Sequence, residues 1–132
     1  SRAPDGPGDR DPDGSSAVEL CLPPRAEHLR LARFAAGGAA SRAGLDVDAI
    51  DDVRLAISEL CSLLIGSGAP ITLSVASVHG GVVIEGRGTT GPELARETGE
   101  LARVLAEAVV DEYEFVVDGT QARFRVAKSR DV

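Results

Sequence analysis

The stretch from Leu45 to Gly66, LDVDAIDDVRLAISELCSLLIG, most constrains the fold of this chain. Its apolar residues recur at helical steps of three and four, at Ile50, Val53, Ile57, Leu60 and Leu64. Asp46 or Asp48 stands where an N-cap is expected. The pattern therefore predicts a long amphipathic helix from about Val47 to Ile65, with one face directed into a core.

Size and charge limit the classes of protein to consider. The chain has 132 residues, which is the length of a single domain. Its 21 acidic residues outnumber 14 basic ones, the net charge is -7, and aromatic residues make up only 3%. A nucleic-acid-binding surface needs basic and stacking side chains, so we expect no nucleic-acid partner. No apolar run approaches the roughly 18 residues of a membrane span, and we expect a cytoplasmic protein without a membrane partner.

Two cysteines and the N-terminal segment complete this first survey. Neither Cys21 nor Cys61 has a Cys or His at metal-ligand spacing, so both are interpreted as small buried hydrophobes and no metal site is expected. Residues 1–16 contain Pro, Gly, Asp and Ser but no residue suited to a core, and they are predicted to form a flexible acidic tail. Residues 17–130 are then one domain.

The remaining patterns predict a mostly antiparallel sheet with helices on one face. The predicted strands are Ala17 to Leu22, Ile71 to Val78, Val82 to Glu85, Glu112 to Val117 and Gln121 to Ala127, with turns at His79 to Gly81 and at Asp118-Gly119. The other predicted helices run from Pro24 or Arg25 to Ala43, capped by Gly44, and within Glu93 to Val110, beginning as late as Thr98. Arg87 to Pro92 is predicted as a loop. The expected fold is an α+β two-layer sandwich in the order β-α-α-β-β-α-β-β.

The first predicted helix carries two apolar stripes. One contains Leu29, Ala32 and Ala36, and the other contains Leu31, Phe34, Ala35 and Gly38. One stripe is expected to face the core and the other a partner, although a helix buried on most sides has the same pattern. Arg30, Arg33 and Arg42 lie on the remaining surface, where arginines suit an acidic partner or a solvated face.

The two helical stretches and the closing hairpin resemble one known family. The run HLRLARFAAGGAASRAGLDVDAIDDVRLAISELCS and the final VVDEYEFVVDGTQARFRVAK are similar to the anti-sigma-factor serine kinases of the GHKL, or Bergerat-fold, ATPase superfamily. The resemblance covers roughly residues 17 to 128. It implies a Bergerat-like fold with an unusually short lid over the ATP position, because only the segment Thr89 to Thr98 separates the two glycine motifs.

The resemblance also places an ATP site whose ligand positions have changed. Glu59 matches the family's catalytic base, but Leu63, four residues later on the same helix face, replaces the Asn that holds magnesium. A leucine has no oxygen to offer that cation. In the D-x-G-x-G motif, Gly86 replaces the adenine-binding Asp and only Gly88 is retained. Gly99 and Glu100 stand where a glycine pair binds phosphate, and the Glu100 carboxylate is expected to repel it.

These departures predict a degenerate member with no catalytic residue, no cofactor and no metal, in which Glu59 is a remnant. The family then implies a regulatory binding module for a sigma factor, a STAS-domain antagonist or a paralogous kinase. The partner-binding candidates are Arg30, Leu31, Arg33, Phe34 and Arg42, with Arg33 matching an arginine of the family's sigma contact and the Leu31 stripe a possible homodimer seam. Two alternatives remain: an active kinase with unusual ligands, and a small-molecule sensor whose pocket is lined by Leu63, Leu64 and Ile65.

Overall fold

A computed structural model describes residues 16–130 of the chain. The central helix, α2 (Val47–Ile65), has the predicted bounds. Its N-cap is Asp46, whose Oδ1 accepts a hydrogen bond from the backbone nitrogen of Ala49 over 2.8 Å, because the first turn of a helix has no backbone acceptors of its own. Apart from Ser16, the predicted tail lies outside the described residues.

The helix before α2 begins later than predicted. Arg25 keeps an extended backbone after the two prolines, a 3-10 turn follows at Ala26–His28, and α1 spans Leu29–Arg42. Gly44 ends it as predicted, with a φ of 86° that a residue with a Cβ rarely adopts. Of the two predicted stripes, the one with Ala32, Ala36 and Ala40 is buried.

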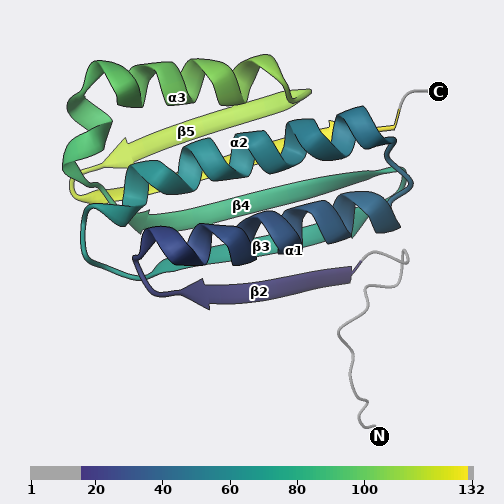
Figure 1. The fold of residues 1–132 in the computed structure, drawn as a ribbon, viewed down its shortest axis with the longest axis horizontal. Helices are drawn as coiled ribbons and strands as arrows, with labels where there is room; N and C mark the ends of the chain where they lie inside the picture. Colours follow the sequence, from purple (N-terminus) through teal and green to yellow (C-terminus); the bar gives the residue numbers. More distant parts are fainter. Residues whose placement is uncertain (1–15, 131–132) are drawn as a thin grey trace, which may run out of the picture.

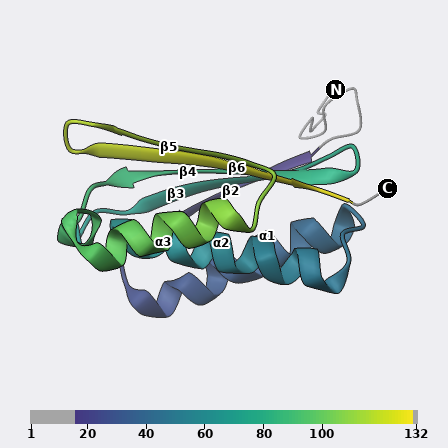
Figure 2. The ribbon, with the colours of Figure 1, turned by 90° about the horizontal axis from the view of Figure 1, so that it is seen from above.

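Five strands form one fully antiparallel sheet. They are β2 (Ser16–Leu22), β3 (Ile71–Val78), β4 (Gly81–Thr89), β5 (Glu112–Asp118) and β6 (Gln121–Ser129), arranged in the order β2-β3-β4-β6-β5. Figure 2 shows the three helices on one face of this sheet, and no helix of residues 16–130 lies on the opposite face. The predicted two-layer α+β sandwich and its chain order are confirmed (Figure 1).

Strand β4 is longer than predicted. Arg87 to Thr89, predicted as the start of a loop, continue the strand and pair with Arg123 to Gln121 of β6. The local sequence is rich in Gly and Arg and is a poor strand former, but the neighbouring strand supplies hydrogen-bonding partners along its whole length. The segment that the resemblance assigns to a glycine-rich ligand loop is therefore a regular part of the sheet.

The core lies between the sheet and α2. Ile57, Leu60 and Leu64 of α2 are fully buried against Leu73 and Ile84 of the sheet. Cys61 belongs to this core as predicted. The prediction for Cys21 is wrong: β2 turns alternate residues to opposite faces, and Cys21 falls on the exposed side.

The third helix, α3 (Glu97–Ala108), follows a 3-10 turn at Pro92–Ala95. Its buried residues are the small ones, Gly99, Ala102 and Ala106, which allow the helix to lie close to its neighbours. Leu101, Leu105 and Ala108 of this helix are exposed, while Leu94 before the helix and Val109 after it pack partly against the core. In the described part of the chain, no helix combines the length and hydropathy that a bilayer span requires.

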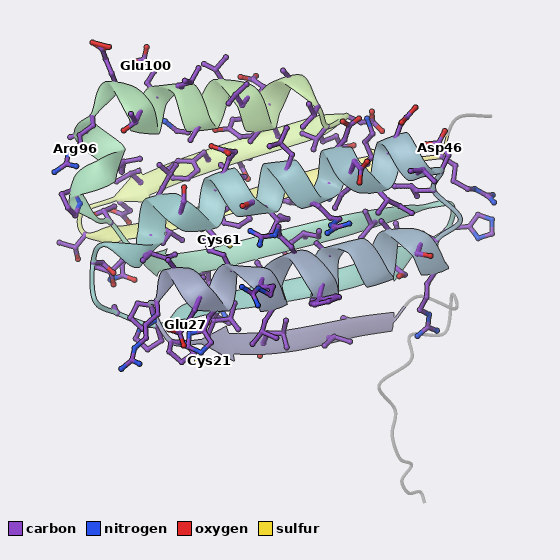
Figure 3. All side chains as sticks on the ribbon, in the orientation of Figure 1. Cys21, Glu27, Asp46, Cys61, Arg96 and Glu100 are labelled. Atoms are coloured by element: carbon purple, nitrogen blue, oxygen red, sulfur yellow. The ribbon has the colours of Figure 1, made fainter. Side chains whose placement is uncertain are left out.

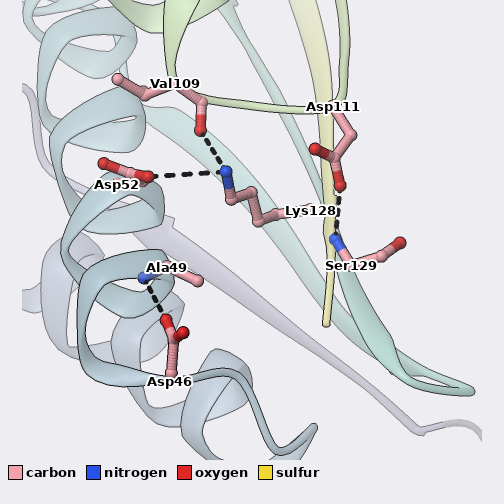
Figure 4. Close-up of polar contacts among 7 residues, drawn as sticks. All are labelled: Asp46, Ala49, Asp52, Val109, Asp111, Lys128 and Ser129. Carbon is pink, nitrogen blue, oxygen red and sulfur yellow. Dashed lines mark hydrogen bonds and ion pairs between the residues drawn. The ribbon is translucent and has the colours of Figure 1, made fainter. Parts of the chain in front are cut away.

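Lys128, the one lysine of the sequence, joins α2 to the end of α3 (Figure 4). Its Nζ donates to the backbone oxygen of Val109 over 2.9 Å and lies 3.5 Å from Oδ2 of Asp52. The next residue, Ser129, donates its backbone N–H to Oδ2 of Asp111 over 2.7 Å. These contacts satisfy a carbonyl at the C-terminus of α3 and fix the chain where it turns into β5.

Candidate functional site

Glu59 and Leu63 share one face of α2, as predicted, but their surroundings differ. Leu63 is 2% exposed and belongs to the apolar core, whereas Glu59 is half-buried. Among the described residues, no hydrogen bond or ion pair holds the Glu59 carboxylate. A magnesium ion needs oxygen ligands, and the buried Leu63 side chain offers none beside this carboxylate.

Gly86 of β4 lies opposite Phe124 of β6 in the sheet register. A Cβ added to Gly86 would overlap the Phe124 ring, at Cζ and Cε2. The ring is itself buried and occupies the space on the helix-covered side of the strand. The sheet therefore has no room at position 86 for an adenine-binding Asp, or for any other side chain, while Phe124 stays in place.

The space beside Gly88, the second glycine of this stretch, is likewise filled, here by Leu64 of α2. A Cβ at Gly88 would lie 3.1 Å from Cδ1 of Leu64, closer than ordinary van der Waals contact. Leu64 is fully buried. An apolar side chain therefore packs over each glycine, Phe124 over Gly86 and Leu64 over Gly88. The backbone at these two positions is not open to a ligand on that side.

At the start of α3, the two backbone N–H groups at the expected phosphate-binding glycine pair are already hydrogen-bonded within the helix. The backbone nitrogens of Gly99 and Glu100 both donate to the backbone oxygen of Arg96, over 3.0 and 3.1 Å. The Glu100 side chain points outward, away from α2 and the sheet (Figure 3). The repulsion of phosphate by Glu100 stays a prediction.

The connection between β4 and α3 packs directly on α2. Thr90 donates its backbone N–H to the backbone oxygen of Thr120 over 2.8 Å, which holds the end of β4 to the β5–β6 hairpin. Leu94, within the 3-10 turn at Pro92–Ala95, packs partly against the core. The short lid expected from the sequence is therefore a tight turn attached to the body of the domain.

Away from these positions, a metal cluster and the buried thiol Cys61 are the two other features to consider. Between residues 16 and 130, no three His, Cys, Asp or Glu side chains gather as a metal site would require. Burial raises the pKa of the Cys61 thiol to about 12, so this thiol stays protonated and is a poor nucleophile. A hollow of about 310 Å³ lies on the helix-free face of the sheet, lined by side chains of both charges, including Glu85, Arg87, Arg123 and Arg125.

The second stripe of α1 forms an exposed apolar surface. Phe34 is 71% exposed and Leu31 is 51% exposed, and Gly38 is also exposed. Arg30 and Arg42 lie exposed on the same helix. We call Arg30, Leu31, Arg33, Phe34 and Arg42 the α1 face. Single exposed hydrophobes are common, but an exposed phenylalanine beside an exposed leucine is typical of a contact surface.

Arg33 differs from the other arginines of the α1 face because it is already engaged. Its Nη1 donates to Oγ of Ser58 on α2 over 3.2 Å, and the side chain is half-buried. This bond holds the guanidinium between the two helices. Arginine carries five N–H groups, and within residues 16–130 this is the one side-chain hydrogen bond of Arg33.

Comparison with known proteins agrees with this architecture. No protein-family model matches the chain. The anti-sigma-F factor RsbW of Mycobacterium tuberculosis, in strains CDC 1551 and H37Rv, is 32% identical over 111 residues, which is 82% of this chain and 66% of the relative. The serine-protein kinase RsbW of Bacillus cereus strain AH187 is 35% identical over 48 residues, 36% of this chain and 30% of that protein.

The fold is a two-layer α+β sandwich of the kind that the sequence resemblance implies. The chain belongs to the anti-sigma-factor serine kinase family. It spans just under two thirds of the length of the mycobacterial relatives and less of the Bacillus kinase.

Sequence reasoning located the altered positions but missed what fills them. Phe124 is 38 residues from Gly86, and only the β4–β6 register shows that the ring lies over that glycine. Gly86 alone was a signal that a side chain from elsewhere approaches the strand, because glycine inside a strand often marks such a close approach.

Proposed function

We propose that this protein is a regulatory binding module of the anti-sigma type that works without ATP. The observation that supports this most strongly is the packing of Phe124 over Gly86 and Leu64 over Gly88. Side chains of the chain itself fill the space beside position 86, where the family has its adenine-binding Asp, and beside Gly88, where the family's glycine lets the backbone approach the ligand. Binding of adenine there would require a buried aromatic ring to leave the core.

The absence of kinase activity follows from the same positions. Leu63 supplies no oxygen for magnesium, and a kinase needs that ion to bridge and neutralise the phosphates. Glu59, although retained, then has no nucleotide to act beside. We infer that Glu59 is a surface carboxylate of α2 and that the protein is a pseudokinase.

The partner surface that we propose is the α1 face. The relatives of this chain are named as an anti-sigma-F factor and as a serine-protein kinase. We therefore expect the partner to be a sigma factor, a STAS-domain antagonist or a paralogous kinase. An apolar pair, Leu31 and Phe34, flanked by arginines suits an apolar patch rimmed by carboxylates. The same pair is a possible homodimer seam. A monomer mass by light scattering at high protein concentration would reject the homodimer.

Calorimetric titration with ATP, with and without magnesium, tests the nucleotide claim. We expect no heat and no change in melting temperature, whereas ligand at a hundred times its dissociation constant would stabilise the native state by about 2.7 kcal/mol. The Bacillus cereus kinase serves as the positive control. Saturable binding in the micromolar range would contradict the proposal and return Glu59 to consideration as a catalytic base.

The partner claim needs a separate experiment. Purified sigma factors and STAS-domain proteins of the same organism are tested for complex formation by pull-down and calorimetry. The double variant Leu31→Ser/Phe34→Ser is expected to weaken binding at least tenfold, because it removes the exposed apolar centre of the α1 face. Unchanged affinity in that variant would reject the α1 face as the binding site.

A further inference from the structure

We propose that α3 carries a second docking surface, which binds an amphipathic helix with basic flanks from another protein. The surface is the outward stripe Glu97, Glu100, Leu101, Val104, Leu105 and Ala108, here called the α3 face. These positions are spaced three and four apart and therefore lie on one side of the helix. The inference does not rest on the proposed function, because it involves neither the nucleotide position nor the α1 face.

The α3 face is apolar where a solvated helix would be polar. Leu101 and Val104 are each 56% exposed and Leu105 is 38% exposed, while the residues turned inward are Gly99, Ala102 and Ala106. A helix with a single core interface normally buries its large residues and exposes its small or polar ones. On α3 the large residues are outside, which indicates a second interface.

The position of α3 leaves this surface accessible. Figure 1 shows α1 and α3 at opposite edges of the helix layer, with α2 between them, and no element of residues 16–130 lies beyond α3. A shallow depression runs along this side, lined by Glu97, Thr98, Glu100, Leu101 and Val104. A helix in a groove needs apolar anchors of this spacing.

Charge decides which occupant fits. The outward side of α3 carries the exposed carboxylates Glu97, Glu100 and Glu107, whereas Arg103 is directed back over the ring of Phe115, 5.8 Å from its centroid. The exposed Arg96 lies at the N-cap, before the stripe. Lysine or arginine beside the apolar anchors of a partner would meet these carboxylates.

Two other occupants fit less well. A symmetric contact between two antiparallel α3 helices would bring Glu100 of each copy near Glu107 of the other, and like charges at an interface are unfavourable. The segment before Ser16 has no large apolar side chain to cover Leu101 or Val104. A basic amphipathic helix satisfies both the apolar and the charged part of the α3 face.

The test uses the full chain and three synthetic helical peptides as probes. One has leucines at steps of three and four and lysines elsewhere, one replaces leucine by serine at equal charge, and one replaces lysine by glutamate. Fluorescence anisotropy is expected to show saturable binding of the leucine-lysine peptide alone. The variant Leu101→Ser/Val104→Ser should weaken it at least tenfold, and Glu97→Lys/Glu100→Lys should weaken it as well.

The matched control is Leu31→Ser/Phe34→Ser, which removes an exposed apolar pair of similar size on the α1 face and should leave peptide affinity unchanged. Circular dichroism checks that each variant folds. No binding, or an equal loss in the α1 variant, would overturn the proposal. Light scattering tests for a dimer. If the parent chain is a dimer and Leu101→Ser/Val104→Ser is a monomer, the α3 face binds a second copy of the chain and the proposal is overturned.

Discussion

The ring of Phe124 on β6 occupies the space beside Gly86 on β4, so that the two residues fit together as a side chain and the gap that receives it. Strand pairing places them directly opposite each other. The glycine is required because of the ring, and the ring is buried because of the glycine. This pair determines what position 86 can hold.

Restoring the family's aspartate at position 86 should destabilise the protein severely. Gly86→Asp introduces a carboxylate into a buried site already filled by Phe124, and we expect a loss of at least about 3 kcal/mol in the free energy of unfolding. Urea denaturation measures it. Gly38→Asp is the matched control, because a Cβ there meets nothing within 4 Å and the expected change is about 1 kcal/mol or less.

A double-mutant cycle separates overlap from burial of charge. Phe124→Ala alone should cost about 3–5 kcal/mol through the cavity it leaves. In Gly86→Asp/Phe124→Ala the overlap is gone, so the combined loss should be smaller than the sum of the single losses by at least about 1 kcal/mol. Strict additivity would show that the ring and position 86 do not compete for space.

Restoring the magnesium ligand should also fail. Leu63→Asn places an amide in the core and removes apolar contacts, and we expect a loss of about 3 kcal/mol in the free energy of unfolding with no gain of ATP binding. Leu55→Asn, on the exposed side of the same helix, should cost less than about 1 kcal/mol. Magnesium-dependent ATP binding by Leu63→Asn in calorimetry would contradict the interpretation of a filled site.

The buried thiol predicts how stability depends on pH. The pKa of Cys61 rises from 9.0 to about 12 on burial, so between these values the unfolded chain loses the thiol proton while the native state keeps it. Stability therefore falls as pH rises above 9, by up to about 1.4 kcal/mol per pH unit. Burial also raises the pKa of Tyr113, which acts in the same direction above pH 10.

Urea unfolding at pH 8 and at pH 10.5 measures this fall. Cys61→Ala should show a flatter dependence than the parent chain, whereas Cys21→Ala, at an exposed position, should follow the parent. A thiol reagent should label one cysteine in the native protein and two in urea. Equal slopes for the parent and Cys61→Ala would remove the thiol from the explanation.

Charge reversal on the α1 face should prevent partner binding without unfolding the chain. Arg33→Glu places a carboxylate where we propose contact with acidic side chains, and complex formation should be abolished in a pull-down. Ser58→Ala is the control, because it removes the 3.2 Å hydrogen bond to Arg33 and leaves the guanidinium in place. If both variants lose binding, complex formation depends on how Ser58 positions the Arg33 side chain, and the proposed charge contact with the partner is not supported.

The elements that could be predicted are those with strong local signals. Helix α2 has its predicted bounds because its apolar spacing is long and Asp46 caps it. The two hairpins turn where Gly80 and Gly119 adopt positive φ values of 75° and 63°, which their sequences indicate.

The misses have non-local causes. The end of β4 forms because β6 pairs with it, although Arg87 and Gly88 have little strand propensity. On α3, apolar residues occupy adjoining sides, and periodicity alone cannot say that Gly99, Ala102 and Ala106 are the side that packs inward. The ring over Gly86 likewise depends on a pairing of distant strands.

The mutual fit of Phe124 and Gly86 also limits the sequences that descendants of this chain can reach. An aspartate at position 86 overlaps the ring, and a smaller residue at position 124 leaves a cavity, so either change alone makes the fold less stable. Both orders of substitution pass through a weakened intermediate. A polar pocket therefore requires substitutions at both position 86 and position 124, and no single mutation reverses the present packing.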